Sequence, residues 1–227
     1  MCNLYSQTRN VEAVRRLFRV SSNRAVAIEP RDAIFPGHSA PVVRKATDGD
    51  RELVELSWGF VLPQPGKAPR RVTNTRDDKV QSAFWRDSIR LRRCLVPASS
   101  FCEPNGDVKP ATWNWFALSD PQVPRPLFSF AGIWRTHQGP IKKDGPPVTL
   151  DVFSFMTTLP NELVATVNHE RMPVLLTTEE DHETWLNGSV EDALGLVKPY
   201  PPEKMRIVQT GYEKMDRLEG AASTIGQ

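Results

Sequence analysis

The second residue of this chain, Cys2, combines a reactive side chain with a position at the start of the polypeptide. The initiator methionine is usually removed when the next residue is small, and that removal would give Cys2 a free α-amine. The reference pKa is about 7.7–8.0 for an α-amine and about 8.5 for a thiol, so both groups are partly nucleophilic at neutral pH. The amine can attack an aldehyde to form an imine. The thiol can then close a five-membered ring in an intramolecular step, for which effective molarities reach about 10⁵–10⁸ M. An N-terminal Cys2 is therefore suited to trapping an aldehyde as a thiazolidine.

Two further residues have side chains that can move protons. Glu103 follows an apolar run at 94–97 that reads as a buried strand. Partial desolvation there would raise the pKa of the carboxyl toward the range useful for proton transfer. His169 titrates near neutral pH, and Arg171, two residues further on, offers a planar fork of donors to a phosphate. Taken singly, Glu103 also suits a turn that faces water, and His169 suits a hydrogen-bonded loop.

Positive charge is concentrated in residues 67–93, where nine Lys or Arg and three Asp give +6, against +2 for the whole chain. A basic patch on a nearly neutral protein is what phosphate binding requires, although a solvated helix face has the same composition. Asn74 and Arg76 lie in this segment and offer hydrogen bonds and charge. The ring of Trp85 is suited to stacking on a nucleic-acid base or to filling an ordinary core.

The secondary structure must position these residues. The sequence predicts mainly strands in the middle of the chain and helices at its ends and in insertions. Aromatic and β-branched runs predict strands at 41–44, 53–60, 94–97, 112–118, 127–134, 148–158, 174–176 and 205–208. Helices are predicted at 11–18 with Asn10 as cap, at 79–90 with Asp78 as cap, and at 161–166, 178–186 and 190–194. Segment 62–71 is predicted to be a loop, and segment 99–110 a turn-rich excursion. Because strands and helices do not alternate, we predict an α+β fold with a mainly antiparallel, barrel-like core and peripheral helices.

Composition narrows the class of protein. The chain has 227 residues, 39% hydrophobic and 25% charged, which is typical of one globular domain spanning 1–227, with a flexible tail at 218–227. No run approaches the roughly 20 apolar residues of a membrane span, and the polar N-terminus does not resemble a signal peptide, so we expect a cytoplasmic protein with no membrane partner. Three cysteines and four dispersed histidines predict neither a disulfide framework nor a metal site, and we expect no cofactor.

Nine short motifs occur in a particular order over residues 1–180 and together resemble one known family. They are Cys2, Phe35-Pro36-Gly37, Trp58-Gly59-Phe60, Asn74-Thr75-Arg76, Arg93-Cys94-Leu95-Val96-Pro97, Phe101-Cys102-Glu103, Phe130-Ala131-Gly132-Ile133-Trp134, Thr157-Thr158 and His169-Glu170-Arg171-Met172-Pro173. The family is SRAP, the SOS response-associated peptidases, whose members form DNA–protein crosslinks at abasic sites.

The resemblance implies a compact α+β fold that binds single-stranded DNA and single-strand/duplex junctions, and it implies protection of abasic sites during the DNA damage response. It assigns Cys2 as the residue that forms a thiazolidine with the abasic aldehyde, and Asn74 as the residue that orients the amine and the sugar. Glu103 would move protons, and His169 would assist sugar ring opening and crosslink reversal. The DNA contacts predicted are Arg76, Arg171, Thr158, Pro36, Trp85 and Arg71. We expect a monomer that associates with the nucleoid when bound to DNA.

The chain also departs from the family pattern. Family members usually begin Met-Cys-Gly-Arg, whereas here Asn3 and Leu4 follow Cys2, which removes an arginine that contacts DNA phosphate in the family. The family's Phe-Tyr-Glu-Trp becomes Phe-Cys-Glu-Pro, with Cys102 and Pro104 beside the retained glutamate, and Ala33 replaces an asparagine. These departures leave the four reacting residues in place and alter the contacts expected with DNA.

Three functions remain open from the sequence. The first is covalent crosslinking to abasic DNA. The second is peptide cleavage by an N-terminal nucleophile that acts on Met1 or on other peptides, since such enzymes use the terminal amine as their own base. The third is a non-catalytic single-strand DNA-binding module. The first predicts dependence on Cys2 and on base loss, whereas the third predicts indifference to both.

Overall fold

The computed structural model describes residues 2–21, 24–167 and 169–217. Its strands are β1 (Tyr5–Gln7), β2 (Arg31–Ile34), β3 (Ser39–Lys45), β4 (Arg51–Trp58), β5 (Phe60–Leu62), β6 (Arg70–Val72), β7 (Asn74–Arg76), β8 (Arg93–Ala98), β9 (Ser100–Asn105), β10 (Thr112–Leu118), β11 (Phe128–Gly139), β12 (Val148–Thr158), β13 (Met172–Pro173), β14 (Leu175–Leu176) and β15 (Met205–Gly211). The α-helices are α1 (Val11–Phe18), α2 (Arg86–Leu91), α3 (Glu162–Ala165), α4 (Glu179–Asn187) and α5 (Val190–Gly195), and the 3₁₀ turns are η2 (Asp77–Lys79) and η3 (Pro202–Lys204).

Five strands pair in a closed ring. Strand β12 pairs with β4, β4 with β3, β3 with β8, β8 with β11, and β11 again with β12. All of these pairings are antiparallel except that of β12 with β4. Closure leaves the ring without exposed edges. The long strand β12 also carries β7 in parallel and β13 in antiparallel orientation, so it links the barrel to the short strands around the site.

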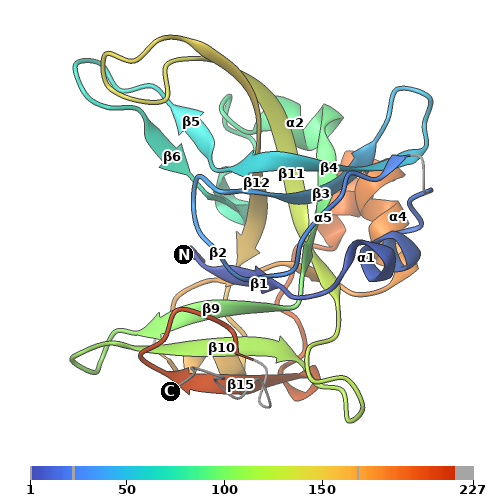
Figure 1. Ribbon diagram of the computed structural model, residues 1–227, viewed down its shortest axis with the longest axis vertical. Helices are drawn as coiled ribbons and strands as arrows, with labels where there is room; N and C mark the ends of the chain where they lie inside the picture. Colours follow the sequence, from blue (N-terminus) through green and yellow to red (C-terminus); the bar gives the residue numbers. More distant parts are fainter. Residues whose placement is uncertain (1, 22–23, 168, 218–227) are drawn as a thin grey trace, which may run out of the picture.

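A second sheet of five strands, in the order β15-β10-β9-β1-β2, lies against one end of the barrel (Figure 1). Its N-terminal strand β1 pairs with β9 through Tyr5 opposite Phe101 and Ser6 opposite Ser100. Helices α1, α4 and α5 gather on one side of the barrel in the same view. The chain start is thereby built into the sheet that covers the barrel end.

Two apolar layers follow from the period-two alternation of the barrel strands. On β12, Phe153 and Phe155 join a cluster that includes Cys2 and Tyr5, whereas Val152 and Met156 join a cluster with the helices. Tyr5 fills the first cluster and lies edge-on to Trp58, with ring centroids 5.0 Å apart. Fully burying such a side chain stabilises a fold by about 1.5–3 kcal/mol. The core thus fixes the strand that follows Cys2.

The predicted α+β class with a mainly antiparallel, barrel-like core is confirmed. The predicted strands at 112–118 and 148–158 coincide with β10 and β12, and Asn10 caps α1 by accepting the Ala13 N–H at 3.0 Å. The predicted helix 79–90 is wrong, because only Arg86–Leu91 is α-helical and Asp78 lies within a 3₁₀ turn. The predicted turn-rich excursion at 99–110 is wrong in its first half, because Ser100–Asn105 forms β9 between β1 and β10, whereas 106–110 are turns and bends.

No α-helix in the described ranges has the length and apolar character needed to cross a bilayer. The predicted flexible tail at 218–227 lies outside the described residues.

Candidate active site

Cys2 lies three residues before β1, and its side chain is fully buried. Its Sγ is 3.5 Å from the carbonyl oxygen of Leu4. Burial raises the pKa of the Cys2 thiol well above its usual value, and the negative charge of Glu103 raises it further. The thiol is therefore held in its protonated form and lies within electrostatic range of Glu103. Met1 lies outside the described residues.

Asn74 begins β7 and contacts the backbone at Cys2. Because β7 runs parallel to β12 with Asn74 opposite Phe155, its side chain is placed at the barrel end, 3% exposed. Its Nδ2 donates to the carbonyl oxygen of Cys2 at 2.8 Å. One residue earlier, Thr73 Oγ1 donates to Asn3 Oδ1 at 2.8 Å. Two consecutive residues of this segment therefore hold the chain start.

Glu103, which is buried, and His169, which is partly exposed, form a pair beside Cys2. Glu103 lies on β9 with no exposed surface, and its Oε2 is 2.9 Å from Nε2 of His169. His169 lies between α3 and β13, with Nδ1 2.7 Å from the carbonyl oxygen of Arg171. Since that oxygen can only accept, Nδ1 carries a proton. Burial lowers the pKa of His169, but Glu103 and the Arg171 carbonyl outweigh burial and raise it overall. The pair is therefore suited to an imidazolium facing a carboxylate.

Unused hydrogen-bonding atoms remain in these buried residues. Within the described part of the chain, Oδ1 of Asn74, Oε1 of Glu103 and Oγ1 of Thr157 are buried without a hydrogen-bond partner. Leaving such a group unsatisfied costs about 1–3 kcal/mol, so proteins rarely do so without a reason. Asn74 and Glu103 are the residues around Cys2, so each presents an acceptor oxygen close to the chain start.

The predicted phosphate contacts Arg76 and Arg171 are already engaged by carboxylates. Arg76 lies on the surface, and its Nε and Nη2 donate to the two oxygens of Asp78 at 2.8 and 2.9 Å. Arg171 is only 8% exposed, and its Nη2 donates to Asp77 Oδ1 at 2.6 Å and to the Thr157 carbonyl. Thr158, predicted to line the pocket, is 3% exposed and hydrogen-bonds Asp77. Sequence reasoning missed Asp77, whose only signal was its place directly after Arg76.

Pro36 and Arg71 border a pocket beside Cys2. The pocket has a volume of about 460 Å³ and is lined by Asn3, Pro36, Arg70, Arg71, Val72, Thr73 and Asn74. Arg71 Nη1 contacts Ser57 Oγ and the carbonyl oxygens of Trp58 and Gly59 at 3.1–3.4 Å. No carboxylate within the described ranges pairs with Arg71, and burial lowers its pKa. Its positive charge is thus held rigidly at the pocket without a countercharge.

Trp85 does not lie where a base could stack on it. The ring is 6% exposed and packs between Phe60 and Phe84, with centroids 5.0 and 4.6 Å away. The position of Trp85 therefore does not support the predicted DNA contact. The ring is part of the hydrophobic core. The reason is that turns at 80–85 direct the ring inward, where a regular helix was expected.

Three departures from the family pattern gather in one place. Leu4 and Cys102 are buried with Trp115 on one face of the five-stranded sheet, and Ala33 packs against them. The amide of Cys102 also donates to the carbonyl of Leu4 at 2.9 Å. Position 4 is therefore an apolar core position in this chain and has no guanidinium to offer to DNA.

The part of the chain that carries these site residues also matches a known protein family. Residues 1–213 match the family model for the SOS response associated peptidases, SRAP. This chain belongs to the SRAP family. An SRAP relative named abasic site processing protein YoqW, from Bacillus subtilis, is 31% identical over 175 residues, which is 70% of each chain. The abasic site processing protein HMCES of Gallus gallus is 25% identical over 195 residues, covering 72% of this chain and 56% of that protein.

Solved structures share the SRAP fold of this chain. A protein from Bordetella bronchiseptica has a TM-score of 0.72 at 20% identity, covering 94% of this chain and all of that one. One from Bacteroides thetaiotaomicron has a TM-score of 0.69 at 22% identity, covering 90% of both. No cluster of three or more metal-binding side chains occurs in the ranges that the structure describes.

Proposed function

We propose that this protein processes abasic sites in single-stranded DNA by forming a thiazolidine between Cys2, freed of Met1, and the open-chain aldehyde of the sugar. The observation that carries the proposal is the meeting of Cys2, Asn74 and the Glu103–His169 pair, from four distant stretches of chain, at one site. The names of the relatives YoqW and HMCES, as abasic site processing proteins, support the substrate class.

The first step is opening of the closed abasic sugar. The ring is a hemiacetal, so the C1 hydroxyl must lose a proton while the ring oxygen gains one as its bond to C1 breaks. Glu103 Oε1, buried and without a partner within the described residues, is suited to accept the first proton. His169, whose raised pKa favours the imidazolium, is suited to supply the second. The products are an aldehyde at C1 and a hydroxyl at C4.

The second step joins the aldehyde to Cys2. The neutral α-amine adds to C1, and the resulting carbinolamine loses its hydroxyl as water to give an imine. The thiol sulfur then adds to the imine carbon, and the thiol proton passes to the nitrogen, which closes the five-membered ring. Asn74, which holds the Cys2 carbonyl at 2.8 Å, keeps the amine and thiol beside the incoming aldehyde. The net change is loss of one water.

DNA is held through its phosphates in this proposal, largely without reading sequence. Arg71 and its neighbour Arg70 line the pocket together with Pro36, and neither guanidinium has a carboxylate partner in the described ranges, so both are available to phosphate. Arg76 and Arg171 bind phosphate only if it displaces Asp78 or Asp77. Their contribution to affinity is therefore smaller than their charges suggest.

The test uses protein whose intact mass shows that Met1 has been removed. With single-stranded DNA containing one abasic site, we expect a covalent adduct that survives denaturation and has the mass of both partners less one water. Undamaged DNA of the same sequence should give none. Cys2→Ala should abolish the stable adduct, while Cys94→Ala, which removes another buried thiol, should leave it in place.

The alternatives give different results. Cleavage of added peptides with no DNA adduct would favour an N-terminal peptidase. Salt-dependent binding that ignores Cys2 and base loss would favour a non-catalytic DNA-binding module. An undiminished adduct from Cys2→Ala would refute the assignment of the nucleophile.

A further inference from the structure

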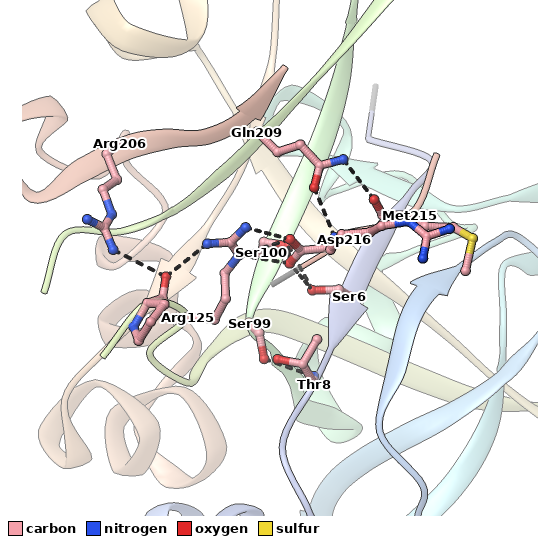
Figure 2. A network of polar contacts seen from close by, with 11 residues as sticks. Ser6, Thr8, Ser99, Ser100, Arg125, Arg206, Gln209, Met215 and Asp216 are labelled. Atoms are coloured by element: carbon pink, nitrogen blue, oxygen red, sulfur yellow. Dashed lines mark hydrogen bonds and ion pairs between the residues drawn. The ribbon is translucent and has the colours of Figure 1, made fainter. Parts of the chain in front are cut away.

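A buried polar network joins the C-terminal part of the chain to the strand that follows Cys2. Asp216 has no exposed surface, and its carboxylate lies between the guanidinium of Arg125 and the hydroxyls of Ser6 and Ser100 (Figure 2). Nε of Arg125 lies 2.9 and 3.0 Å from the two carboxylate oxygens, and its Nη2 lies 2.7 Å from Oδ1. The backbone N–H of Asp216 donates to the Asp32 carbonyl at 2.9 Å. We call Ser6, Ser100, Arg125 and Asp216 the clamp.

The clamp bridges a specific pair of residues. Ser6 on β1 and Ser100 on β9 lie directly opposite each other in the sheet. Oδ2 of Asp216 is 2.9 Å from Ser6 Oγ and 2.6 Å from Ser100 Oγ, and the two hydroxyl oxygens are 2.7 Å apart. The two serine hydroxyls have only two protons to donate among these three contacts. Because a carboxylate oxygen only accepts, Asp216 can take a hydrogen bond from either serine. It holds the two strands together at one defined register.

Register at this point decides where the reacting groups lie. Strand β1 has only three residues, and it starts three residues after Cys2, while β9 carries Glu103 three residues after Ser100. Backbone bonds support the same pairing, among them Cys102 N–H to the Leu4 carbonyl and Ser99 N–H to the Ser6 carbonyl, both 2.9 Å. The clamp is the side-chain contact that joins the two strands at this register. A slip of one residue would turn alternate side chains to the opposite face. Cys2 would then no longer face Glu103.

We propose that Asp216 is a positioning residue that fixes the β1–β9 register and thereby seats Cys2 against Glu103. This inference rests on the proposed function, because it concerns the geometry of that reaction. Asp216 touches neither the substrate nor the reacting atoms. It acts through Ser6 on one strand and Ser100 on the other.

Ser6→Ala is the sharpest variant, since it removes the link to β1 and leaves the buried Arg125–Asp216 ion pair intact. Single-turnover crosslinking at saturating abasic DNA should slow by about 10- to 100-fold, because misplacement by about 1 Å costs a factor of this size. The dissociation constant for the DNA and the final extent of reaction should stay unchanged. Ser6→Thr, which keeps the hydroxyl, should restore most of the rate. Ser129→Ala, which removes another buried serine hydroxyl outside the clamp, is the matched control.

A purely structural role predicts something else. It would lower the melting temperature and the fraction of reactive protein while the rate constant of the folded fraction stayed at the wild-type value, and that result would overturn the proposal. Replacing Arg125 by Met together with Asp216 by Leu removes the clamp without leaving a buried charge unpaired, a change that folded proteins tolerate. This double variant should show the same slow rate as Ser6→Ala.

A second readout does not depend on the reaction. The Cys102 amide, which reports the β1–β9 pairing, should exchange its hydrogen at least about 10-fold faster in Ser6→Ala than in the wild type. Unchanged exchange would reject the positioning role whether or not the wild type crosslinks DNA. Accelerated exchange in a protein whose wild type forms no adduct would reject the proposed function and leave the register role standing.

Discussion

Replacing Glu103 by Gln separates the contribution of this residue to chemistry from its contribution to stability. The change keeps the size of the side chain and removes its charge. Two opposing terms set the effect on folding. The variant loses a 2.9 Å ion pair with His169, and a hydrogen bond to a charged group contributes about 1.5–3 kcal/mol. It also removes a buried charged acceptor that has no partner at Oε1 within the described residues, whose burial costs at least about 1–3 kcal/mol.

Because the two terms are of similar size, we expect the free energy of unfolding to change by no more than about 1.5 kcal/mol. A change of that size shifts the melting temperature of a protein of this length by roughly 3–6 °C. The reaction should suffer far more. General acid–base catalysis contributes about 10²–10⁴ in rate, which is about 2.7–5.5 kcal/mol of barrier. Crosslinking should therefore slow by two to four orders of magnitude in a protein that melts almost normally.

The assay pairs single-turnover crosslinking on denaturing gels with thermal unfolding of the same preparation. Glu29→Gln, at an exposed position, controls for loss of one negative charge and should match the wild type in both measurements. Crosslinking by Glu103→Gln at the wild-type rate would refute the assigned proton-transfer role. Destabilisation by more than about 4 kcal/mol would show instead that Glu103 is a structural ion-pair partner.

Three further predictions concern groups around the site. Trp85→Ala should lower the free energy of unfolding by about 3–5 kcal/mol, because a buried aromatic side chain is lost, while the DNA affinity of the folded protein stays unchanged. Denaturant titration measures the first quantity and fluorescence anisotropy the second. A loss of affinity without a loss of stability would restore the base-stacking role. Asp77→Asn frees the Arg171 guanidinium, so the slope of log affinity for DNA against log salt should steepen by about one, and an unchanged slope would show that Arg171 stays inaccessible. His169 has a raised pKa, so its pairing stabilises the fold fully below its usual value of 6.5 and loses this effect as pH rises through the raised pKa. The melting temperature of the wild type should therefore exceed that of His169→Gln most at pH 5.5–6.5 and least near pH 9, and a gap independent of pH would contradict the charged pair.

Local pattern was enough for elements whose own residues decide their conformation. Strand β12 coincides with the predicted 148–158 because aromatic and β-branched residues fill it, and α1 begins where Asn10 can cap it. Strand β9 was missed, since Glu103, Pro104 and Asn105 have weak β-propensity and the strand exists through pairing with β1 and β10. Tertiary contacts decide such segments.

The same distinction applies to the site. The order of the motifs predicted Cys2, Asn74, Glu103 and His169 as candidates, and the structure brings these four together. The ion pair of Arg171 could not be predicted from the sequence, because its partner Asp77 lies 94 residues away along the chain. No local pattern marks such a pairing.

The burial of Cys2 has a consequence for its reactivity toward small molecules. Oxidants and alkylating reagents attack the thiolate, and a thiol that is kept protonated and shielded from solvent reacts slowly with them. Cys94 and Cys102 are buried as well, and burial raises the pKa of both thiols. The native protein should therefore resist iodoacetamide and hydrogen peroxide at all three thiols. An electrophile that first captures the α-amine delivers its carbon directly to the sulfur, so aldehydes gain access to a nucleophile that freely diffusing thiol reagents reach only when the fold opens.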